Sequence, residues 1–200
     1  SFSRELGGSA LRYAQIRSMD ISNGDGVGIS LFVQGCHFHC YNCFNSETWD
    51  FQGGSEWTKE IKSQFLGLID KPFVKRVSIL GGEPMADENV NEICMLLNEI
   101  RYTFRDKIIW LYTGYTWEEL FDYHWQEKVD LMFSENLLER RTDLIKTCRQ
   151  NTIKLCDVLV DGKYIDDERD MTLKWRGSKN QRVIDVQKSL CKRELVLWTT

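Results

Sequence analysis

The sequence predicts an α/β fold, a partial (β/α) barrel or open curved sheet that is mostly parallel and has helices on its outside. Short apolar runs alternate with amphipathic stretches along the chain, which is the pattern of right-handed βαβ units. The chain has 200 residues, whereas a closed eight-stranded barrel typically needs about 250. The sequence contains no internal repeat, low-complexity tract or linker, so we expect residues 1–200 to form a single domain.

The first half of the chain begins this alternation. We expect a strand over 28–35, "GISLFVQG", and a second strand over 76–80, "RVSIL". A helix near 58–71 is expected between them. The second strand runs into "GGEP" and then into a helix over about 87–101, whose apolar residues recur at helical spacing.

The second half of the chain continues the alternation. Thr116 and Glu119 have the form of a capping box, which predicts a short helix beginning at this point. The other predicted elements are strands over 108–112, 156–160 and 182–186 and a less distinct helical region around 136–149. The total is about five or six strands, and the polar sites of such folds gather at the carboxyl ends of the strands.

The composition limits the partners. The formal net charge is −4 and the isoelectric point is about 5.5. We therefore expect neither a nucleic-acid partner nor a membrane surface, because both require clustered Lys and Arg. No apolar run of about 18 residues is present, and the opening "SFSRELGGSA" lacks the apolar segment of a secretory signal. These features predict a cytoplasmic protein.

The seven cysteines indicate metal binding rather than disulfides. An odd number cannot pair completely, and disulfides are rare in a reducing compartment. Three are tightly clustered in "VQGCHFHCYNCFN": Cys36, Cys40 and Cys43. The remaining four lie far apart in the sequence and are expected to have structural roles: Cys94, Cys148, Cys156 and Cys191.

The clustered cysteines favour an iron–sulfur cluster over zinc. A structural zinc site closes its tetrahedron with a fourth Cys or His, and His37 or His39 would do so only with steric crowding. A cubane cluster has four irons, so three thiolates leave one iron open to an outside ligand. We expect both histidines to pack or hydrogen-bond around the loop, and zinc stays open as the alternative.

The segment "ILGGEPM" is a second candidate for a binding site. Gly81 and Gly82 follow a predicted strand and allow a backbone to approach a ligand without a Cβ in the way. Pro84 then fixes the direction of the chain. An ordinary strand-to-helix turn has the same form, so it is the combination with the cysteine loop that favours a site.

Together, the CxxxCxxC loop and the GGEP segment resemble those of the radical S-adenosylmethionine superfamily, and the resemblance covers most of the chain. It implies a partial (β/α) barrel of the radical S-adenosylmethionine type. It also implies a 4Fe-4S cluster whose metal ligands are Cys36, Cys40 and Cys43, and S-adenosyl-L-methionine bound to the fourth iron through its amino and carboxylate groups.

The resemblance also implies where the cosubstrate lies. Gly81, Gly82 and Glu83 are expected near the methionine amino group, and Thr113 is expected as a further cofactor contact. A common superfamily form has an aromatic residue directly before the third cysteine, where this chain has another residue type.

The chain departs from that form around Cys43. Asn42 stands at the position of the superfamily aromatic, and the activating-protein subfamily carries its aromatic after the last cysteine instead. This places Phe44 near the nucleoside, and Asn42 and Cys43 are expected beside it as cofactor-binding residues.

Four further segments resemble the activating proteins of anaerobic ribonucleoside-triphosphate reductase: "DISNGDG" (20–26), "LYTGYTWEEL" (111–120), "VLVDGKYI" (158–165) and "WRGSKNQRVIDV" (175–186). On spacing alone, the polar residues of the last segment form a solvated turn before a strand. The resemblance makes site candidates of Arg176, Ser178, Asn180 and Gln181. Asp25 replaces the usual Pro of the first segment, and the region 121–154 is longer than in the smallest relatives.

The resemblance implies an enzyme, a glycyl-radical enzyme activase with no catalytic side chain beyond the cluster ligands. A reduced cluster passes one electron to S-adenosyl-L-methionine, and the resulting 5′-deoxyadenosyl radical takes a hydrogen atom from a glycine of the reductase. The implied partners are anaerobic ribonucleoside-triphosphate reductase and a reducing electron donor such as flavodoxin. Two alternatives remain: activation of another glycyl-radical enzyme, of the pyruvate formate-lyase type, and a non-catalytic zinc-binding interaction protein.

Overall fold

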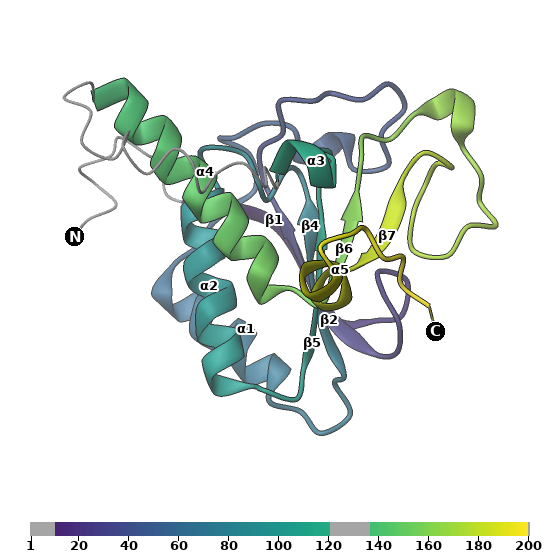
Figure 1. Ribbon diagram of the computed structural model, residues 1–200. Coiled ribbons are helices and arrows are strands. Elements are labelled where there is room, and N and C mark those ends of the chain that lie inside the picture. Colours follow the sequence, from purple (N-terminus) through teal and green to yellow (C-terminus); the bar gives the residue numbers. More distant parts are fainter. Residues whose placement is uncertain (1–10, 121–136, 200) are drawn as a thin grey trace.

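The computed structural model describes residues 11–120 and 137–199, and the strands within these ranges form one seven-stranded sheet (Figure 1). The strand order is β3-β1-β2-β4-β5-β6-β7. The central strands run parallel to one another: β2 (Gly28–Val33), β4 (Arg76–Gly81), β5 (Ile108–Tyr112) and β6 (Val158–Asp161). The α/β class and the parallel centre of the sheet are therefore confirmed.

In the described part of the chain, the three outer strands are antiparallel to their neighbours, which corrects the predicted number and direction of strands. At one edge β1 (Arg12–Asp20) pairs with β2, and β3 (Ser55–Glu56) pairs with β1. At the other edge β7 (Arg182–Asp185) pairs with β6. The segment 162–181 between them contains only a 3-10 turn, η5 (Asp166–Glu168), and without a crossover helix the chain returns in the opposite direction.

Three helices cover one side of the sheet (Figure 1): α1 (Lys59–Ile69), α2 (Val90–Thr103) and α4 (Leu137–Leu155). Their apolar residues and those of the strands form the main hydrophobic core, which includes Phe65, Ile79, Ile93, Leu97, Leu111 and Ile153. Such burial is the dominant favourable term in the stability of the fold. None of the helices in the described ranges is long and apolar enough to cross a membrane.

The predicted long helices are confirmed with shifted ends. Thr58 caps α1, because its hydroxyl accepts a hydrogen bond from the Ile61 backbone N–H (3.3 Å). α2 begins at Val90, three residues later than expected. α4 extends beyond the predicted end at 149, and the stretch 121–136 before it lies outside the described residues.

The described part of the chain also has a 3-10 turn, η2 (Ser46–Thr48), and two short α-helices. The capping box is confirmed at α3 (Trp117–Leu120): the Glu119 N–H donates to the Thr116 hydroxyl (3.3 Å), and the Thr116 N–H donates to the Glu119 carboxylate (2.7 Å). α5 (Val186–Lys192) was not predicted, because seven residues are too few to show a helical period.

The opposite side of the sheet is covered by loops in the described part of the chain. Arg76 and Ser78 of β4 alternate with the apolar core residues of that strand and therefore point to this side. Trp110 of β5 is fully buried there against the rings of Trp175 (centroids 5.0 Å apart) and Trp198 (5.9 Å). This side therefore combines polar and aromatic surface beneath loops.

Candidate functional site

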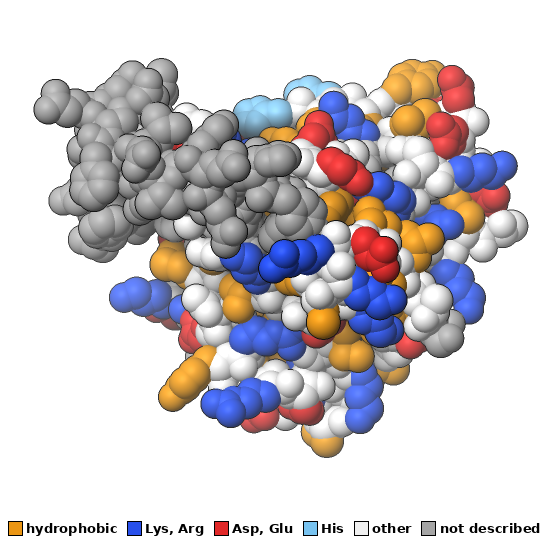
Figure 2. Space-filling model, in the orientation of Figure 1, with side chains coloured by type: hydrophobic (Ala, Val, Ile, Leu, Met, Phe, Trp, Pro, Cys, Tyr) orange, Lys and Arg blue, Asp and Glu red, His pale blue; other side chains and the backbone are white. Residues whose placement is uncertain are grey.

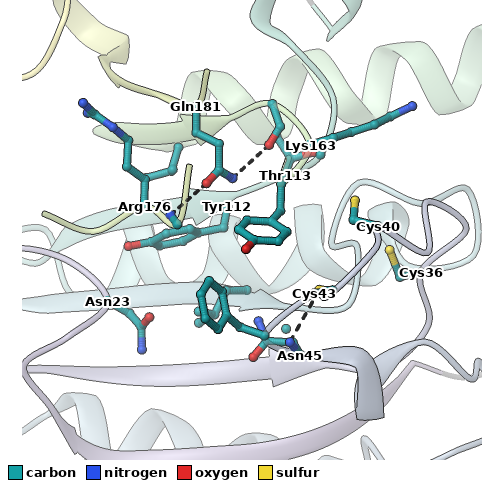
Figure 3. Close-up of a pocket in the computed structure, with 18 of the residues that line it drawn as sticks. Asn23, Cys36, Cys40, Cys43, Asn45, Tyr112, Thr113, Lys163, Arg176 and Gln181 are labelled. Carbon is teal, nitrogen blue, oxygen red and sulfur yellow. Dashed lines mark hydrogen bonds between the residues drawn. The ribbon is translucent and has the colours of Figure 1, made fainter. Parts of the chain in front are cut away.

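A cavity of about 520 Å³ lies on the loop-covered side of the sheet, at the carboxyl ends of the central strands. Of the seven cysteines, all of which lie in the described ranges, only Cys36, Cys40 and Cys43 line it. In Figure 3, Cys36 and Cys40 lie toward one end of the cavity and Asn23 and Arg176 toward the other. The three clustered thiols therefore share one wall of one cavity.

The cysteine loop is held to the body of the protein by backbone hydrogen bonds and by its two histidines. The Cys36 N–H donates to the Trp49 carbonyl (3.0 Å). His37 contacts the Glu88 carboxylate through Nε2 (3.0 Å). His39 stacks on the Trp49 ring, with centroids 4.6 Å apart. The prediction that both histidines pack or hydrogen-bond around the loop is confirmed.

The three thiols suit a cluster that takes each of them on a different iron. Burial raises the pKa of Cys36 to about 11, and burial also raises the pKa of Cys40, so both are neutral thiols at pH 7 in the metal-free chain. Bound iron supplies the positive charge that favours the thiolate form. Among the described residues, no three His, Cys, Asp or Glu side chains converge as the ligands of a single metal ion do. The ligands of a cluster surround a larger volume.

Two predicted residues beside the third cysteine differ in their placement. Phe44 lines the cavity, is 48% exposed, and packs its ring against Tyr164 (centroids 5.2 Å apart). Asn42, although described, lies outside the cavity wall and donates a hydrogen bond from its side chain to Asp166 (2.9 Å). Its φ of 55° is in the left-handed region, which Asn tolerates better than an aromatic residue. The backbone conformation at this position therefore suits an asparagine.

Gly81 and Gly82 bring the end of β4 against the start of the cysteine loop. Gly81 has a φ of 106°, and a Cβ there would lie 2.8 Å from the Phe32 Cα. A Cβ on Gly82 would lie 2.4 Å from the Gly35 carbonyl oxygen. The Gly82 N–H donates to the Val33 carbonyl (2.8 Å). The glycines therefore permit a close approach of two backbones, and both also line the cavity.

The Glu83 carboxylate is buried and joins the end of β4 to the end of β5. It accepts hydrogen bonds from the Met85 N–H (2.8 Å), the Thr113 hydroxyl (2.8 Å) and the Gly114 N–H (2.7 Å). Burial raises the pKa of Glu83 to about 7, although these hydrogen bonds act to lower it. Glu83 and Thr113 both line the cavity, and the bond between them fixes the orientation of the threonine.

The segment 162–181 completes the cavity wall through Gln181 (Figure 3). The Gln181 side-chain oxygen accepts hydrogen bonds from the N–H groups of Gly177 (2.9 Å) and Ser178 (3.2 Å). Its amide nitrogen donates to the Gly162 carbonyl (3.0 Å). One side chain thus holds the two ends of the segment together.

The four polar residues singled out in this segment divide into two pairs. Arg176 and Gln181 line the cavity. Ser178 is buried, and Asn180 donates to the Lys163 carbonyl (2.8 Å), so this pair stabilises the loop from behind.

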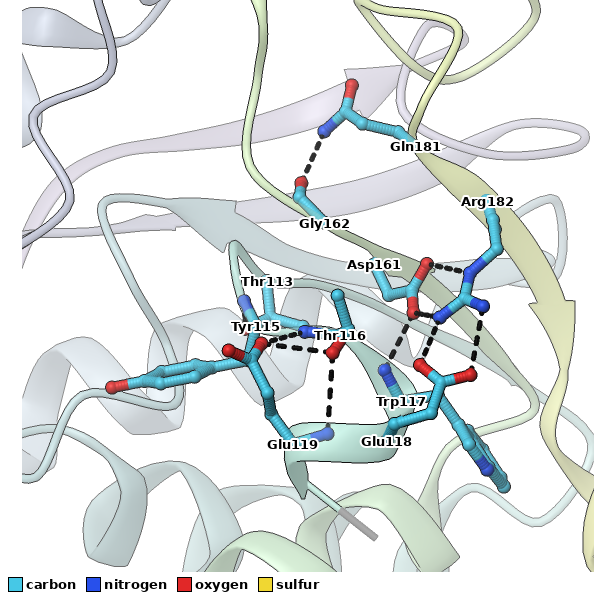
Figure 4. Close-up of polar contacts among 10 residues, drawn as sticks. All are labelled: Thr113, Tyr115, Thr116, Trp117, Glu118, Glu119, Asp161, Gly162, Gln181 and Arg182. Atoms are coloured by element: carbon cyan, nitrogen blue, oxygen red, sulfur yellow. Dashed lines mark hydrogen bonds and ion pairs between the residues drawn. The ribbon is translucent and has the colours of Figure 1, made fainter.

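Arg182 joins β7 to β6 and α3 (Figure 4). Its guanidinium donates to both oxygens of Glu118 (3.0 and 2.7 Å) and to the Asp161 carboxylate (3.0 Å through Nε). Asp161 also accepts a hydrogen bond from the Trp117 N–H (2.7 Å). These groups satisfy one another, so the network fixes the strand ends that carry the site.

The loop 20–26 is fixed by a buried ion pair. Arg76 is fully buried and donates to Asp20 Oδ1 (3.1 Å) and to the Asp20 carbonyl (2.8 Å). Burial alone would raise the pKa of Asp20, but hydrogen bonds from Asn23 and Ser22 help to hold it well below its usual range. Ser22 and Asn23 of this loop line the cavity. The ion pair between Arg76 and Asp20 therefore shapes the end of the cavity that lies away from Cys36 and Cys40.

The sequence analysis did not single out several residues that line the cavity: Arg17, Phe38, Tyr112, Lys163 and Trp175. All of these except Arg17 lie within the quoted segments, and that position was the available signal. Among the described residues on the face shown in Figure 2, Lys and Arg are interspersed with Asp and Glu. This face therefore presents charges of both signs.

The sequence matches a known protein family over most of its length. The family of the 4Fe-4S single cluster domain matches residues 22–184, a range that contains the cysteine loop and the GGEP segment. The fold, the three thiols of the cavity and this match together define the class as an iron–sulfur protein with a single 4Fe-4S cluster.

Relatives named anaerobic ribonucleoside-triphosphate reductase-activating protein narrow the class. The protein of Vibrio cholerae is 33% identical over 173 residues, which is 86% of this chain and 96% of the relative. That of Escherichia coli is 33% identical over 175 residues, 86% and 97% of the two chains. That of Enterobacteria phage T4 is 29% identical over 175 residues, 86% and 93%. This chain belongs to the family of anaerobic ribonucleoside-triphosphate reductase-activating proteins.

Proposed function

We propose that this chain is a radical S-adenosylmethionine activase, which reductively cleaves S-adenosyl-L-methionine and generates a glycyl radical on anaerobic ribonucleoside-triphosphate reductase. The observation that carries the proposal is that three cysteines of one loop and the GGEP segment meet at one cavity, in a member of the activating-protein family. The sheet with helices on one side and the cavity on the other supports a partial barrel of the radical S-adenosylmethionine type.

The proposed cluster ligands are Cys36, Cys40 and Cys43. When bound, the cluster supplies one electron for the reductive cleavage of S-adenosyl-L-methionine, and its fourth iron is left for the amino and carboxylate groups of that cosubstrate. The part of the protein is to orient the cosubstrate, while the difficult bond breaking belongs to the cofactor.

The GGEP segment has a proposed positioning role. Gly81 and Gly82 line the cavity beside the cysteine loop, and neither has a side chain that would stand between this backbone and the methionine amino group. The Glu83 carboxylate accepts three hydrogen bonds from within the chain, which favours an indirect role in binding the cosubstrate. It holds the backbone of the turn and Thr113 in place for the cosubstrate.

The nucleoside is proposed to lie against Phe44, whose half-exposed ring faces the cavity. Aromatic rings bind adenine by stacking. Asn42 supports this contact from outside the cavity through its bond to Asp166. The structure thus supports a direct role for the aromatic residue and an indirect one for the asparagine.

The remaining features of the proposal concern the cellular setting. We propose a reducing electron donor of the flavodoxin type, a cytoplasmic location, and a single domain over 1–200 that binds neither nucleic acid nor a membrane. The net charge of −4 supports the last point.

The test is anaerobic reconstitution with iron and sulfide, chemical reduction, and assay for 5′-deoxyadenosine from S-adenosyl-L-methionine. It is run with and without anaerobic ribonucleoside-triphosphate reductase, and electron paramagnetic resonance detects a glycyl radical. We expect cleavage together with the radical signal on the reductase.

Other outcomes separate the alternatives. Cleavage without a radical on the reductase would move the proposal to another glycyl-radical enzyme, such as one of the pyruvate formate-lyase type. One zinc per chain, with no chromophore and no cleavage, would contradict the activase and support a zinc-binding interaction protein.

A further inference from the structure

Arg149 of α4 contacts the turn that follows the GGEP segment. Its Nε donates to the Met85 carbonyl (2.8 Å), and its Nη2 donates to the Asp87 carboxylate (2.8 Å). The Arg149 side chain is mostly buried, with 17% of its surface exposed, whereas that of Asp87 is 51% exposed. A buried guanidinium that bonds a backbone carbonyl fixes that backbone more tightly than a surface ion pair does.

The same guanidinium also reaches the strand end beside the cysteine loop. Nη2 of Arg149 donates to the Tyr115 hydroxyl (3.0 Å), and the guanidinium carbon lies 4.5 Å from the centre of the Tyr115 ring. Arg149 therefore bonds two loops at once, one after β4 and one after β5.

Tyr115 passes this contact to the cysteine loop through Phe38. The two rings pack edge to face, with centroids 4.8 Å apart. Phe38 stands between two of the clustered cysteines, Cys36 and Cys40. Its ring lies over Gly114, where a Cβ would come within 2.4 Å of it, so the fit leaves no space for a side chain.

We propose that Arg149 is a positioning residue, which holds the GGEP turn and the cysteine loop in the relative arrangement that retains the cluster. This inference rests on the proposed function, because it assumes that the cysteine loop binds iron. It assigns a role to the part of the 121–154 region that the structure describes. Groups bonded directly to a metal ligand typically change metal affinity by about 10-fold to 100-fold when removed. Arg149 reaches the cysteine loop through Tyr115 and Phe38, so we expect an effect at the lower end of that range.

The experiment measures iron retention rather than enzymatic turnover. The anaerobically reconstituted full chain is mixed with excess chelator, and the rate of iron loss is followed by absorbance. Arg149→Met removes all the contacts at similar length, and Arg149→Lys keeps the charge but cannot make the forked contacts. Lys146→Met is the matched control, because it removes an exposed positive charge from the same helix.

We expect Arg149→Met to lose iron about 10-fold faster than the parent, with Arg149→Lys between them and Lys146→Met unchanged. Tyr115→Phe removes one hydrogen bond and keeps the ring, so we expect iron loss to rise about threefold. If Arg149→Met does not fold, Tyr115→Phe still tests the proposal, because it removes one of the same contacts. The thermal midpoint of each metal-free variant is measured in parallel.

Two results would overturn the inference in distinguishable ways. If the parent takes up iron, but Arg149→Met and Tyr115→Phe lose iron at the same rate as the parent, then Arg149 has only a structural role. This conclusion holds even if the thermal midpoint of the variants falls. If the parent itself takes up no iron, the proposed function fails, and the positioning role fails with it.

Discussion

The two sides of the central sheet differ in what covers them and in what their side chains do. The helix-covered side is apolar and fully packed, with residues such as Leu97 and Ile79 buried completely. The loop-covered side carries a buried ion pair, three thiols and a cavity. Substitutions in the apolar core of the first side should therefore change stability and leave the chemistry intact, because in our proposal that side reaches the site through the polar contacts of Arg149 and not through its core. Substitutions on the second side should affect stability at some positions and chemistry at others.

The largest expected effect is that of Cys40→Ala on the loop-covered side. We expect loss of S-adenosyl-L-methionine cleavage by more than about 100-fold, because the cluster loses one of three ligands. The metal-free chain should still fold, since Cys40 lies in a loop at the cavity. Cleavage is measured as 5′-deoxyadenosine formed, with Cys191→Ala, an exposed cysteine away from the cavity, as the control. Parent-level cleavage by Cys40→Ala would contradict the ligand assignment.

Asp20→Asn tests whether the buried ion pair between Asp20 and Arg76 stabilises the loop-covered side of the sheet. Removing the charge leaves the buried Arg76 without its ionic partner, which typically costs about 3–5 kcal/mol. The folded-state pKa of Asp20 is depressed, so its contribution is present above the ordinary carboxyl pKa near 3.8 and is lost as the pH falls below it. Urea unfolding from pH 3 to 7 should therefore show a steeper acid loss in the parent than in Asp20→Asn. Equal slopes, or no difference from the exposed control Asp25→Asn at pH 7, would be inconsistent with the buried pair.

Leu97→Ala tests the helix-covered side. The fully buried side chain leaves a cavity in the core, and we expect a loss of about 3 kcal/mol in the free energy of unfolding. The cleavage rate per folded molecule should stay at the parent value. Met95→Ala, a 48% exposed position on the same helix, should change stability by less than about 0.5 kcal/mol. A large loss of cleavage in folded Leu97→Ala would mean that the two sides are coupled.

Phe44→Ala should have the smallest effect of the set. If its ring stacks on the nucleoside, the KM for S-adenosyl-L-methionine should rise about 10-fold, with a smaller change in kcat. Tyr41→Ala is the control, because this neighbouring aromatic is 78% exposed and lies outside the cavity wall of the described residues. Equal KM values for the two variants would remove Phe44 from the nucleoside site.

The central strands and the cysteine loop were predictable because their signals are local. The buried parallel strands are short, mostly apolar runs, and the cluster ligands stand within eight residues of one another. The capping box of Thr116 and Glu119 is local in the same way. The activating-protein family, predicted from several such segments, is confirmed by the relatives.

What the sequence did not reveal depends on contacts between distant residues. β1 lies second from the edge of the sheet, and much of it is exposed, so its residues do not show a clear alternation of apolar and polar types and the strand was missed. The antiparallel return of β7 follows from a long loop with no crossover helix. The link from Arg149 to Met85 joins residues 64 positions apart, and no local pattern indicates it. The left-handed backbone conformation at Asn42 likewise depends on how the whole cysteine loop folds, and the sequence alone does not indicate it.

The most direct test of the central claim is the electron paramagnetic resonance spectrum of the reduced, reconstituted protein, recorded with and without S-adenosyl-L-methionine beside a measurement of iron and sulfide content. Three cysteine ligands predict about four irons and four sulfides per chain and a spectrum that changes when the cosubstrate binds the open iron. A zinc-loaded protein, or a cluster whose spectrum is the same with and without the cosubstrate, would contradict the account.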